Sequence, residues 1–247
     1  MKKFGWRFLG FVASLALMPA LLLTCVQWRV SSMDYFREEY AKYDVLERVD
    51  MEMDDLLYLT EEMMAYLYDK REELQVTVPI GGEELPFFSE KEIRHMVDVK
   101  NLFSAGMDIR NGCVVFTLAA VIVMFAKKKG RTFLRTLQAG IGVFFAAFGL
   151  LVALMLTDFN KYFTQFHLIF FDNDDWILDE RVDRLINIVP EGFFSDTAFW
   201  IGGVFLGVCL LLFVGAEIIL RLWGRKYLTE EKNGSVEIHL LAYYCFY

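Results

Sequence analysis

The stretch TLQAGIGVFFAAFGLLVALMLT, residues 136–157, contains no charged side chain over its whole length. A helix of about 20 apolar residues is long enough to cross the roughly 30 Å hydrocarbon core of a bilayer. The chain is 56% hydrophobic, and its apolar residues lie in such blocks rather than at the regular intervals of a soluble helix or strand. The stretch therefore predicts a membrane protein, and the other blocks decide how often the chain crosses.

Three other blocks have the same character, at residues 8–28, 111–126 and 197–220. The last of these reaches residue 220 only if Glu217 faces a neighbouring helix or extends its carboxylate to the membrane surface. The block at 111–126 is short, so it spans if the bilayer thins locally or if it continues a helix formed outside the membrane. The first block has no A-x-A site after it, and we expect an uncleaved span rather than a signal peptide.

Basic residues indicate the orientation of these spans. They precede the first span, crowd the link between the second and third in KKKGR (127–131), and follow the fourth. Because cytoplasmic loops carry an excess of Lys and Arg, both termini and this link are expected in the cytoplasm. The two long connections then lie outside, and 29 of the 33 acidic residues fall in them, 20 within 30–108 and 9 within 158–196.

We therefore predict an all-α polytopic membrane protein, with four transmembrane helices and a small, mainly helical extracytoplasmic cap built from two insertions. The transmembrane helices are expected at residues 1–28, 109–126, 136–157 and 197–220. The cap comprises residues 29–108 and 158–196, with a cytoplasmic link at 127–135 and a cytoplasmic tail at 221–247. Within the last span, the spacing Gly203-x-x-x-Gly207 predicts a face that packs closely on another helix.

The first insertion is expected to contain two helices. Residues 44–74 place apolar side chains on one stripe and carboxylates on the opposite face, as in an amphipathic helix; the stripe comprises Leu56, Leu59, Met63, Met64 and Leu67. Pro and Gly residues in VTVPIGGEELPFF (76–88) interrupt this pattern. A second helix is expected to begin at Ser89, since Glu92 three residues later completes a capping box. In the second insertion, WILDERVDRLINIVP (176–190) is a short amphipathic segment that ends at Pro190.

Histidine is the side chain best suited to move protons near neutral pH, and only three are present. His95 lies on the expected helix before the second span, and His167 lies in FTQFHLIFFDNDDW (163–176), shortly after the third. Both are predicted near the junction of cap and membrane, where an apolar environment favours the neutral, proton-accepting ring. A single histidine at such an interface is more often a packing residue than a catalytic one. Two of the three histidines are predicted on the same side of the membrane, and this favours a catalytic pair.

Nearby side chains indicate how such a pair is held. Asp98, three residues after His95, shares its helix face and is positioned to orient the ring, although pairing with a neighbouring Lys or Arg fits the spacing equally well. Glu92, on the same helix, is a second supporting carboxylate. Around His167, aromatic side chains form a candidate substrate pocket, comprising Phe166, Phe170, Phe171 and Trp176.

Other chemistries have less support. The chain has no G-x-S-x-G motif and no cysteine in the two outer insertions to act as a nucleophile. No His-x-x-x-His or His-Glu-x-x-His spacing indicates a metal site, and we expect neither a metal nor another cofactor. The acidic run DNDD (172–175) is either a solvated turn or a site for a hard cation. The spans hold almost no ionisable residue for a transport path, and the basic residues mark topology rather than nucleic-acid binding.

Two motifs resemble one family of bacterial membrane enzymes. They are FSEKEIRHMVDV (88–99) and FHLIFF-x-N-x-x-W-x-L-D (166–179), on a chain with four predicted spans and an outer cap. Together they are similar to the bacterial lipoprotein intramolecular transacylases. The likeness runs from the first span to the fourth and leaves out the stretch from about residue 233. The resemblance implies a multi-pass protein of the bacterial cell membrane.

The resemblance also implies an activity. Such enzymes move the sn-2 acyl chain of a diacylglyceryl lipoprotein to the α-amino group of its N-terminal cysteine, giving a lyso-form lipoprotein. The catalytic histidines of the family fall on His95 and His167. Because the substrate amine is the nucleophile, one histidine is expected to remove its proton, while the other protonates the departing oxygen or stabilises the oxyanion. The expected partners are the diacylglyceryl lipoprotein substrate and membrane lipid, without nucleic acid; the sequence leaves open which histidine is the base.

A non-enzymatic function is the alternative. An acidic cap, with the DNDD run and the segment DDLLYLTEEMM (54–64), is also typical of a membrane sensor or accessory protein that binds a cation or a partner. Neutralising Asp172, Asp174 and Asp175 would then abolish function, whereas histidine substitutions would have little effect.

Overall fold

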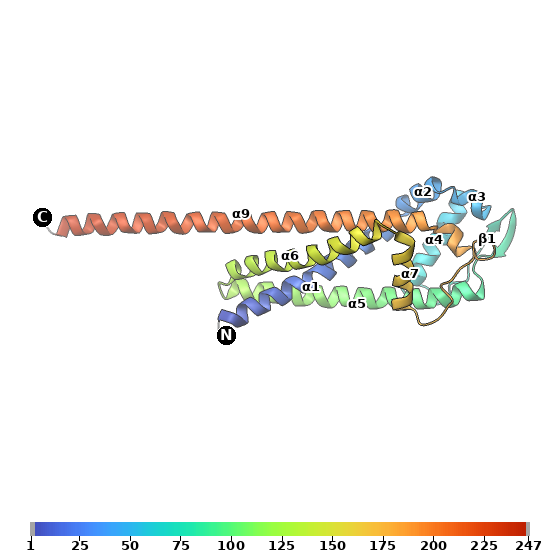
Figure 1. Ribbon diagram of the computed structural model, residues 1–247, viewed down its shortest axis with the longest axis horizontal. Helices are drawn as coiled ribbons and strands as arrows, with labels where there is room; N and C mark the ends of the chain where they lie inside the picture. Colours follow the sequence, from blue (N-terminus) through green and yellow to red (C-terminus); the bar gives the residue numbers. More distant parts are fainter. Residues whose placement is uncertain (1–2, 246–247) are drawn as a thin grey trace.

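Four long helices run side by side and form the body of the protein (Figure 1). The computed structural model describes the backbone of residues 3–245 and the side chains of residues 4–224, so the basic side chains expected in the tail, such as Arg225 and Lys226, lie outside the described part. The long helices are α1 (Lys3–Val30), α5 (Glu90–Ala126), α6 (Gly130–Met155) and α9 (Glu191–Cys245). Helix α1 packs against the other three and is the centre of the bundle.

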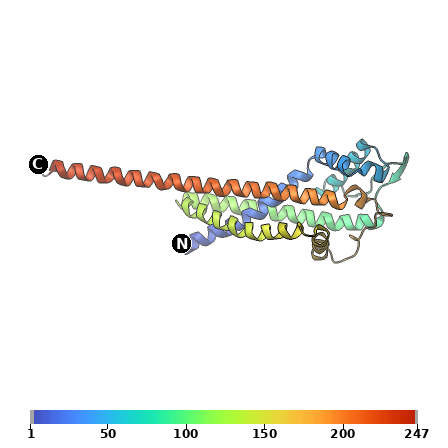
Figure 2. The ribbon, with the colours of Figure 1, turned by 45° about the horizontal axis from the view of Figure 1, so that its top comes forward.

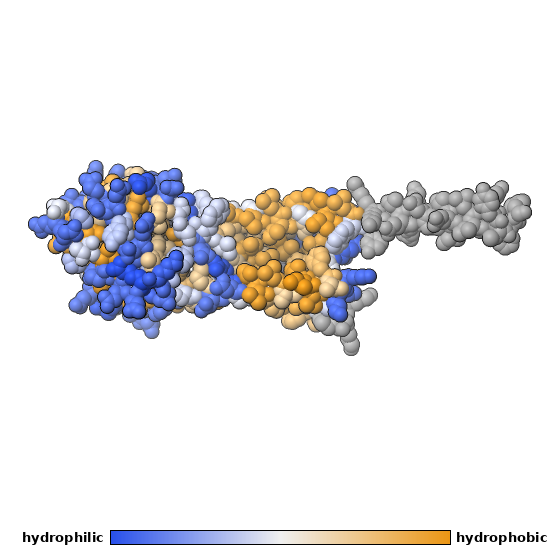
Figure 3. Space-filling model, turned by 180° about the vertical axis from the view of Figure 1, so that it is seen from behind, coloured by the Kyte–Doolittle hydropathy of each residue, from blue (hydrophilic) through white to orange (hydrophobic). Residues whose placement is uncertain are grey.

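Apolar residues cover the face of the bundle seen in Figure 3, between the polar cap and polar residues at its other end. All four long helices are long and apolar enough to cross a membrane. Large hydrophobic side chains on these helices face outward, among them Val115, Ile122, Leu150 and Leu211. Such exposure is unfavourable in water and favourable in lipid. The prediction of an all-α polytopic membrane protein with four spans is confirmed.

Helix α5 extends well beyond the membrane. Its N-terminus carries the predicted capping box, in which the Ser89 side chain accepts from the Glu92 backbone N–H and the Glu92 carboxylate accepts from the Ser89 N–H. A helix of 37 residues is about 55 Å long, nearly twice the thickness of the hydrocarbon core. The short apolar block at 111–126 therefore continues a helix formed outside the membrane, one of the two possibilities that its length left open.

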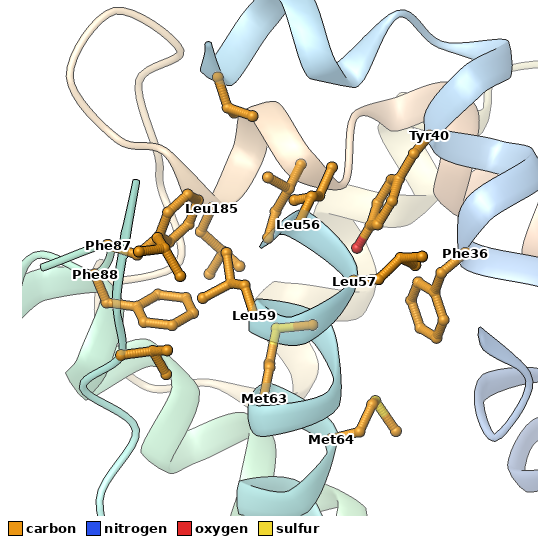
Figure 4. Close-up of a cluster of buried hydrophobic side chains, with 14 of the residues drawn as sticks. Phe36, Tyr40, Leu56, Leu57, Leu59, Met63, Met64, Phe87, Phe88 and Leu185 are labelled. Atoms are coloured by element: carbon orange, nitrogen blue, oxygen red, sulfur yellow. The ribbon is translucent and has the colours of Figure 1, made fainter. Parts of the chain in front are cut away.

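The cap has a hydrophobic core of its own. Its elements are α2 (Met33–Lys42), α3 (Val45–Val49), α4 (Met53–Leu67) and a hairpin of β1 (Thr77–Ile80) and β2 (Glu83–Pro86). The predicted apolar stripe of α4 is buried at every position, against aromatic side chains of α2 and of the segment after β2 (Figure 4). Burial of this stripe is the main force that holds the first insertion together.

The helix predicted over residues 44–74 is wrong as a single element. It is interrupted between α3 and α4, and it ends at Leu67. Asp50 adopts a left-handed conformation with φ 53°, and its carbonyl accepts a 2.9 Å hydrogen bond from the Gly81 N–H in the hairpin turn. Gly81 and Gly82, with φ 59° and 84°, form the two-residue turn between the strands, which requires positive φ at both positions. Contact with the hairpin thus replaces a helical hydrogen bond at Asp50.

The second insertion contains α7 (Phe159–Phe170) and the short α8 (Leu185–Ile188). Helix α7 crosses the bundle at a steep angle where the bundle meets the cap, as Figures 1 and 2 show together. The amphipathic segment at 176–190 is helical only in α8. Instead, turns at Asp179 and Asp183 order this segment, the Asp183 carboxylate accepting from the Asp179 N–H at 2.8 Å.

Close helix packing occurs at a different glycine from those predicted. A Cβ added at Gly203 or Gly207 would meet no atom within 4 Å, so the G-x-x-x-G face packs on no helix of the described chain. A Cβ at Gly140 of α6 would lie 2.6 Å from the Ser14 Cβ of α1. Glycine at this position therefore allows α6 to approach the central helix closely.

Candidate active site

The two candidate histidines meet where the cap joins the bundle. His95 lies in the second turn of α5 and His167 in α7, and their ring centroids are 6.2 Å apart. Each residue is only 8% exposed. Segments that are 72 residues apart in sequence (167 − 95) thus bring two titratable rings into one buried site.

A backbone hydrogen bond determines the proton position on His167. Its Nδ1 lies 2.7 Å from the Phe163 carbonyl oxygen, one helical turn earlier. Because a carbonyl only accepts, Nδ1 carries the proton and donates it. The neutral ring then has its free lone pair on Nε2, which is the atom able to accept a proton from another group.

His95 has a different environment. Its Nδ1 is buried without a hydrogen-bond partner among the described residues, and the ring packs edge-on against Phe171 at 5.3 Å between centroids. Burial and the nearby His167 ring lower the pKa of His95 to about 4, although Asp98 and Asp175 act in the opposite direction. The ring is therefore neutral at neutral pH.

Burial also lowers the pKa of His167, against the opposing effect of its hydrogen bond to Phe163. Both rings are thus neutral in the folded protein, because an apolar site disfavours the imidazolium form. A neutral imidazole can accept a proton at one nitrogen and donate a hydrogen bond from the other. The pair is suited to acid–base chemistry on a bound substrate.

The aromatic side chains predicted as a pocket are only partly gathered around the histidines. Trp176 stacks on His167 at 4.9 Å, Phe171 contacts both histidine rings, and Phe166 meets His167 edge-on at 5.5 Å. Phe170 packs on Phe166 and is 52% exposed, so it lies further from the rings.

Sequence reasoning missed Phe163. Its ring centroid is 4.4 Å from that of His167, and its carbonyl accepts from the same histidine. The i, i+4 spacing of the two residues was the available signal, since such residues lie one above the other on a helix.

Neither predicted carboxylate is hydrogen-bonded to a histidine. Asp98 accepts from the Asn173 side-chain amide at 2.8 Å. Glu92 is 1% exposed and accepts from two backbone N–H groups, those of Ser89 and Leu185, each at 2.6 Å. Both side chains therefore hold the second insertion against α5 instead of touching a ring, and Asp98 acts on His95 only through its charge.

Further contacts fasten the segment after α7 to the same face of α5. Arg94 forms a bidentate ion pair with Asp175, at 2.9 and 3.0 Å, while Lys91 donates to the Ile177 carbonyl and lies 3.6 Å from the Asp183 carboxylate. Two members of the DNDD run are thus engaged with α5. Across the residues whose side chains are described, no cluster of three or more potential ligands is arranged to hold a metal ion.

A partly open apolar pocket of about 250 Å³ lies between α1, α6 and α9. Its lining includes Leu22, Phe148, Met155 and Phe199. Phe199 contacts Phe159, which stacks on Phe163 beneath His167. A continuous aromatic path therefore links the histidine site to an apolar space within the bundle.

Solved structures of a membrane protein share this fold. One is the membrane-integral lipoprotein intramolecular transacylase Lit from Bacillus cereus, which gives a TM-score of 0.67 at 22% identity and covers 94% of this chain and 99% of that chain. A variant of the same protein with a histidine-to-alanine mutation gives a TM-score of 0.70 at 22% identity, over 93% and 96% of the two chains. At this identity the likeness establishes the fold alone.

Sequence comparison establishes the family. A search among curated proteins found no match. A family model described as lipoprotein intramolecular transacylase matches residues 11–194, which include both histidine motifs, most of α1 and the whole of α5 and α6. Because the match covers most of the chain, this protein belongs to the lipoprotein intramolecular transacylase family and is an enzyme.

Proposed function

We propose that the protein transfers the sn-2 acyl chain of a diacylglyceryl lipoprotein to the α-amino group of the lipoprotein's own N-terminal cysteine, and that His95 and His167 are the catalytic residues. The observation that carries this proposal is the meeting of two neutral histidine rings, 6.2 Å apart, in a buried aromatic site at the junction of cap and bundle. The product is a lyso-form lipoprotein.

His167 is the general base in this reaction. An α-amino group has a pKa of about 7.7 to 8, so only a minority of the amine is neutral near neutral pH, and this fraction reacts. The amine nitrogen attacks the ester carbonyl carbon, forming the amide C–N bond, and His167 Nε2 accepts the proton that the nitrogen then loses. The protonated ring passes this proton to the glyceryl oxygen as the ester C–O bond breaks. The reaction consumes and releases no proton or other group overall, as an intramolecular transfer requires.

His95 stabilises the tetrahedral intermediate. With a pKa of about 4, it stays neutral at neutral pH and keeps one N–H group. That group donates a hydrogen bond to the negative oxygen that develops on the ester carbonyl. In this assignment, His167 moves the proton and His95 binds the oxyanion.

The aromatic wall protects the ester from hydrolysis. Phe166, Phe171 and Trp176 cover His167 and exclude the water that would otherwise attack the carbonyl, and Phe170 extends this wall toward the lipid. The acyl chains lie on the bundle side, where the apolar pocket between α1, α6 and α9 offers space for part of one chain. Amine and ester belong to one molecule, so holding both at the histidines converts proximity into rate.

The proposed orientation places the cap outside the cytoplasm of a bacterial cell. Residues 29–108 and 158–196 then face outward and residues 127–135 and 221–247 inward, as the excess of basic residues in the link and tail supports. In this arrangement the histidines lie at the level of the outer membrane surface, where the glyceryl group of a membrane-anchored lipoprotein lies. Asp98 and Glu92 support the site by holding the second insertion.

Mass spectrometry of a lipoprotein's N-terminal peptide tests the proposal. Incubation with the wild-type protein is expected to move one acyl chain onto the cysteine nitrogen without changing the total mass. His95→Ala and His167→Ala are each expected to lower the rate at least about 100-fold, because removal of a general base or oxyanion donor has effects of this size. Thermal unfolding of each purified variant controls for folding. Unchanged acyl positions with folded wild-type protein would refute the reaction, and active, folded histidine variants would refute the assignment of residues.

A further inference from the structure

Two buried nitrogen atoms at the histidine site have no hydrogen-bond partner within the described part of the chain. They are His95 Nδ1 and the indole Nε1 of Trp176. Buried polar atoms in native proteins are nearly always hydrogen-bonded, because burial removes the bonds that water would otherwise supply. Both side chains lie near His167, whose ring centroid is 4.9 Å from that of Trp176 and 6.2 Å from that of His95, and unpaired groups in such a site point to a partner that arrives with the substrate. The mechanism above uses His95 and leaves the Trp176 N–H without a role.

The indole N–H is buried, and contacts of the ring and of its neighbours hold it in place. Its ring lies stacked on His167, with an interplanar angle of 26° and a centroid distance of 4.9 Å. The residues on either side of it are fastened to α5, since Asp175 pairs with Arg94 and the Ile177 carbonyl accepts from Lys91. A donor fixed before the substrate binds requires no reorganisation during the reaction, which is the property of an effective oxyanion donor.

Indole chemistry restricts what Trp176 can contribute. The Nε1–H group only donates hydrogen bonds, so it neither accepts nor releases a proton in this reaction. The geometry points to Trp176 Nε1–H and His95 Nδ1–H as the two donors of an oxyanion hole, which makes Trp176 a catalytic residue. This inference rests on the proposed acyl transfer. As the amine adds to the carbonyl carbon, the C=O π electrons move onto oxygen and both N–H groups bind that oxygen. The pair of electrons returns when the glyceryl oxygen leaves with the proton carried by His167.

Substitution Trp176→Phe tests the role, since it keeps an aromatic ring and removes the N–H. The kcat for acyl transfer is expected to fall about 100-fold or more, the usual effect of deleting one oxyanion donor, while KM changes less than about threefold. The pH dependence of the rate should stay the same, because it reports the substrate amine and His167 rather than the indole. Trp28→Phe is the matched control: Trp28 is 64% exposed and contacts Trp200 rather than a histidine, so its activity should equal that of the wild type. A Trp176→Phe variant with nearly full kcat, or one whose loss comes with a shifted pH profile, would overturn the inference.

A second readout does not depend on turnover. A long-chain alkyl phosphonate monoester carries a tetrahedral, anionic centre like that of the intermediate, and proton NMR of 15N-tryptophan-labelled protein reports each indole N–H. The Trp176 signal, assigned by its absence in Trp176→Phe, is expected to move downfield when the phosphonate binds. If wild-type protein transfers no acyl chain while this signal still moves, the proposed reaction fails and the donor site stands. If acyl transfer occurs and the signal does not move, the donor role fails alone.

Discussion

The His167 ring carries one proton, and its hydrogen bond to the Phe163 carbonyl decides which nitrogen holds it. Burial also lowers the pKa of this ring. Together these contacts produce a base that is free at neutral pH and has its lone pair on a known atom. The same burial acts on His95 without a backbone partner. Two identical side chains thus acquire different roles from their surroundings.

Protonation of His167 is expected to slow acyl transfer only at low pH. Protonation removes the base, and the lowered pKa of His167 moves this loss below the ordinary value of about 6.5. Between about pH 7.5 and 6.5, the logarithm of the rate should therefore fall with a slope of one, from protonation of the substrate amine alone. Rates measured by mass spectrometry from about pH 5 to 8.5 check this. A second bend at or above pH 6.5 would contradict it.

At the scale of elements, α5 runs from the apolar bundle to the candidate active site. Its last turns lie within the apolar bundle, and its first turns carry His95 and the polar face that binds the second insertion. That face comprises Lys91, Glu92, Arg94 and Asp98, each in contact with the segment between residues 173 and 185. Because α7 and this segment are continuous in the chain, these contacts determine where His167 lies relative to His95.

The contact between Asp98 and Asn173 is expected to matter more for rate than for stability. Asn173→Ala removes the 2.8 Å hydrogen bond to Asp98 and the bond that its side-chain oxygen accepts from the Asp175 N–H. The unfolding temperature should change little, since a partly buried bond of this kind contributes about 1 kcal/mol. The transfer rate should fall about tenfold or more, because small displacements of catalytic groups reduce rates steeply.

A double-mutant cycle with Asp98→Ala provides the check. The two substitutions should be clearly non-additive in rate, since they break the same contact. Asp174→Ala, at an exposed neighbour in the same acidic run, is the matched control and should retain full activity. Loss of activity in this control would favour a cation- or partner-binding role of the DNDD run.

At the scale of the whole molecule, two hydrophobic cores lie on either side of the candidate active site. The cap core excludes water, whereas the bundle is apolar on its outside as well as its inside (Figure 3). Helix α7 lies at the boundary between them (Figure 1). This placement suits a substrate that has a polar peptide and acyl chains, because each part can remain in its preferred solvent.

Labelling of introduced cysteines is expected to show the cap outside the cell. The four native cysteines are first replaced by serine, and the cysteine-free protein is the control. Asp54→Cys, whose parent side chain is 93% exposed in the cap, should react with a membrane-impermeant maleimide in intact cells. Lys127→Cys, in the basic link, should react only after permeabilisation, because positively charged links remain in the cytoplasm. The opposite pattern would reverse the proposed orientation.

The features predicted correctly from sequence depend on neighbours along the chain. Four apolar helices, the capping box at Ser89 and the buried stripe of α4 all follow from composition and helical spacing. These are local properties, since lipid or an adjacent apolar face stabilises a helix whatever the details of its surroundings. The family resemblance likewise came from two short motifs, and it is confirmed.

Contacts between distant segments decided the rest. The helix break at Asp50 depends on Gly81, and the partner of Asp98 is Asn173 rather than His95. The unpaired indole N–H of Trp176 is a property of burial in three dimensions, invisible in a sequence where the residue is one aromatic among many. Helical periodicity specifies which residues share a face, whereas packing specifies what that face meets. The sequence by itself therefore determined a four-span membrane protein with two candidate histidines, and only the tertiary structure brought their rings together and determined which of the nitrogen atoms at the site are hydrogen-bonded.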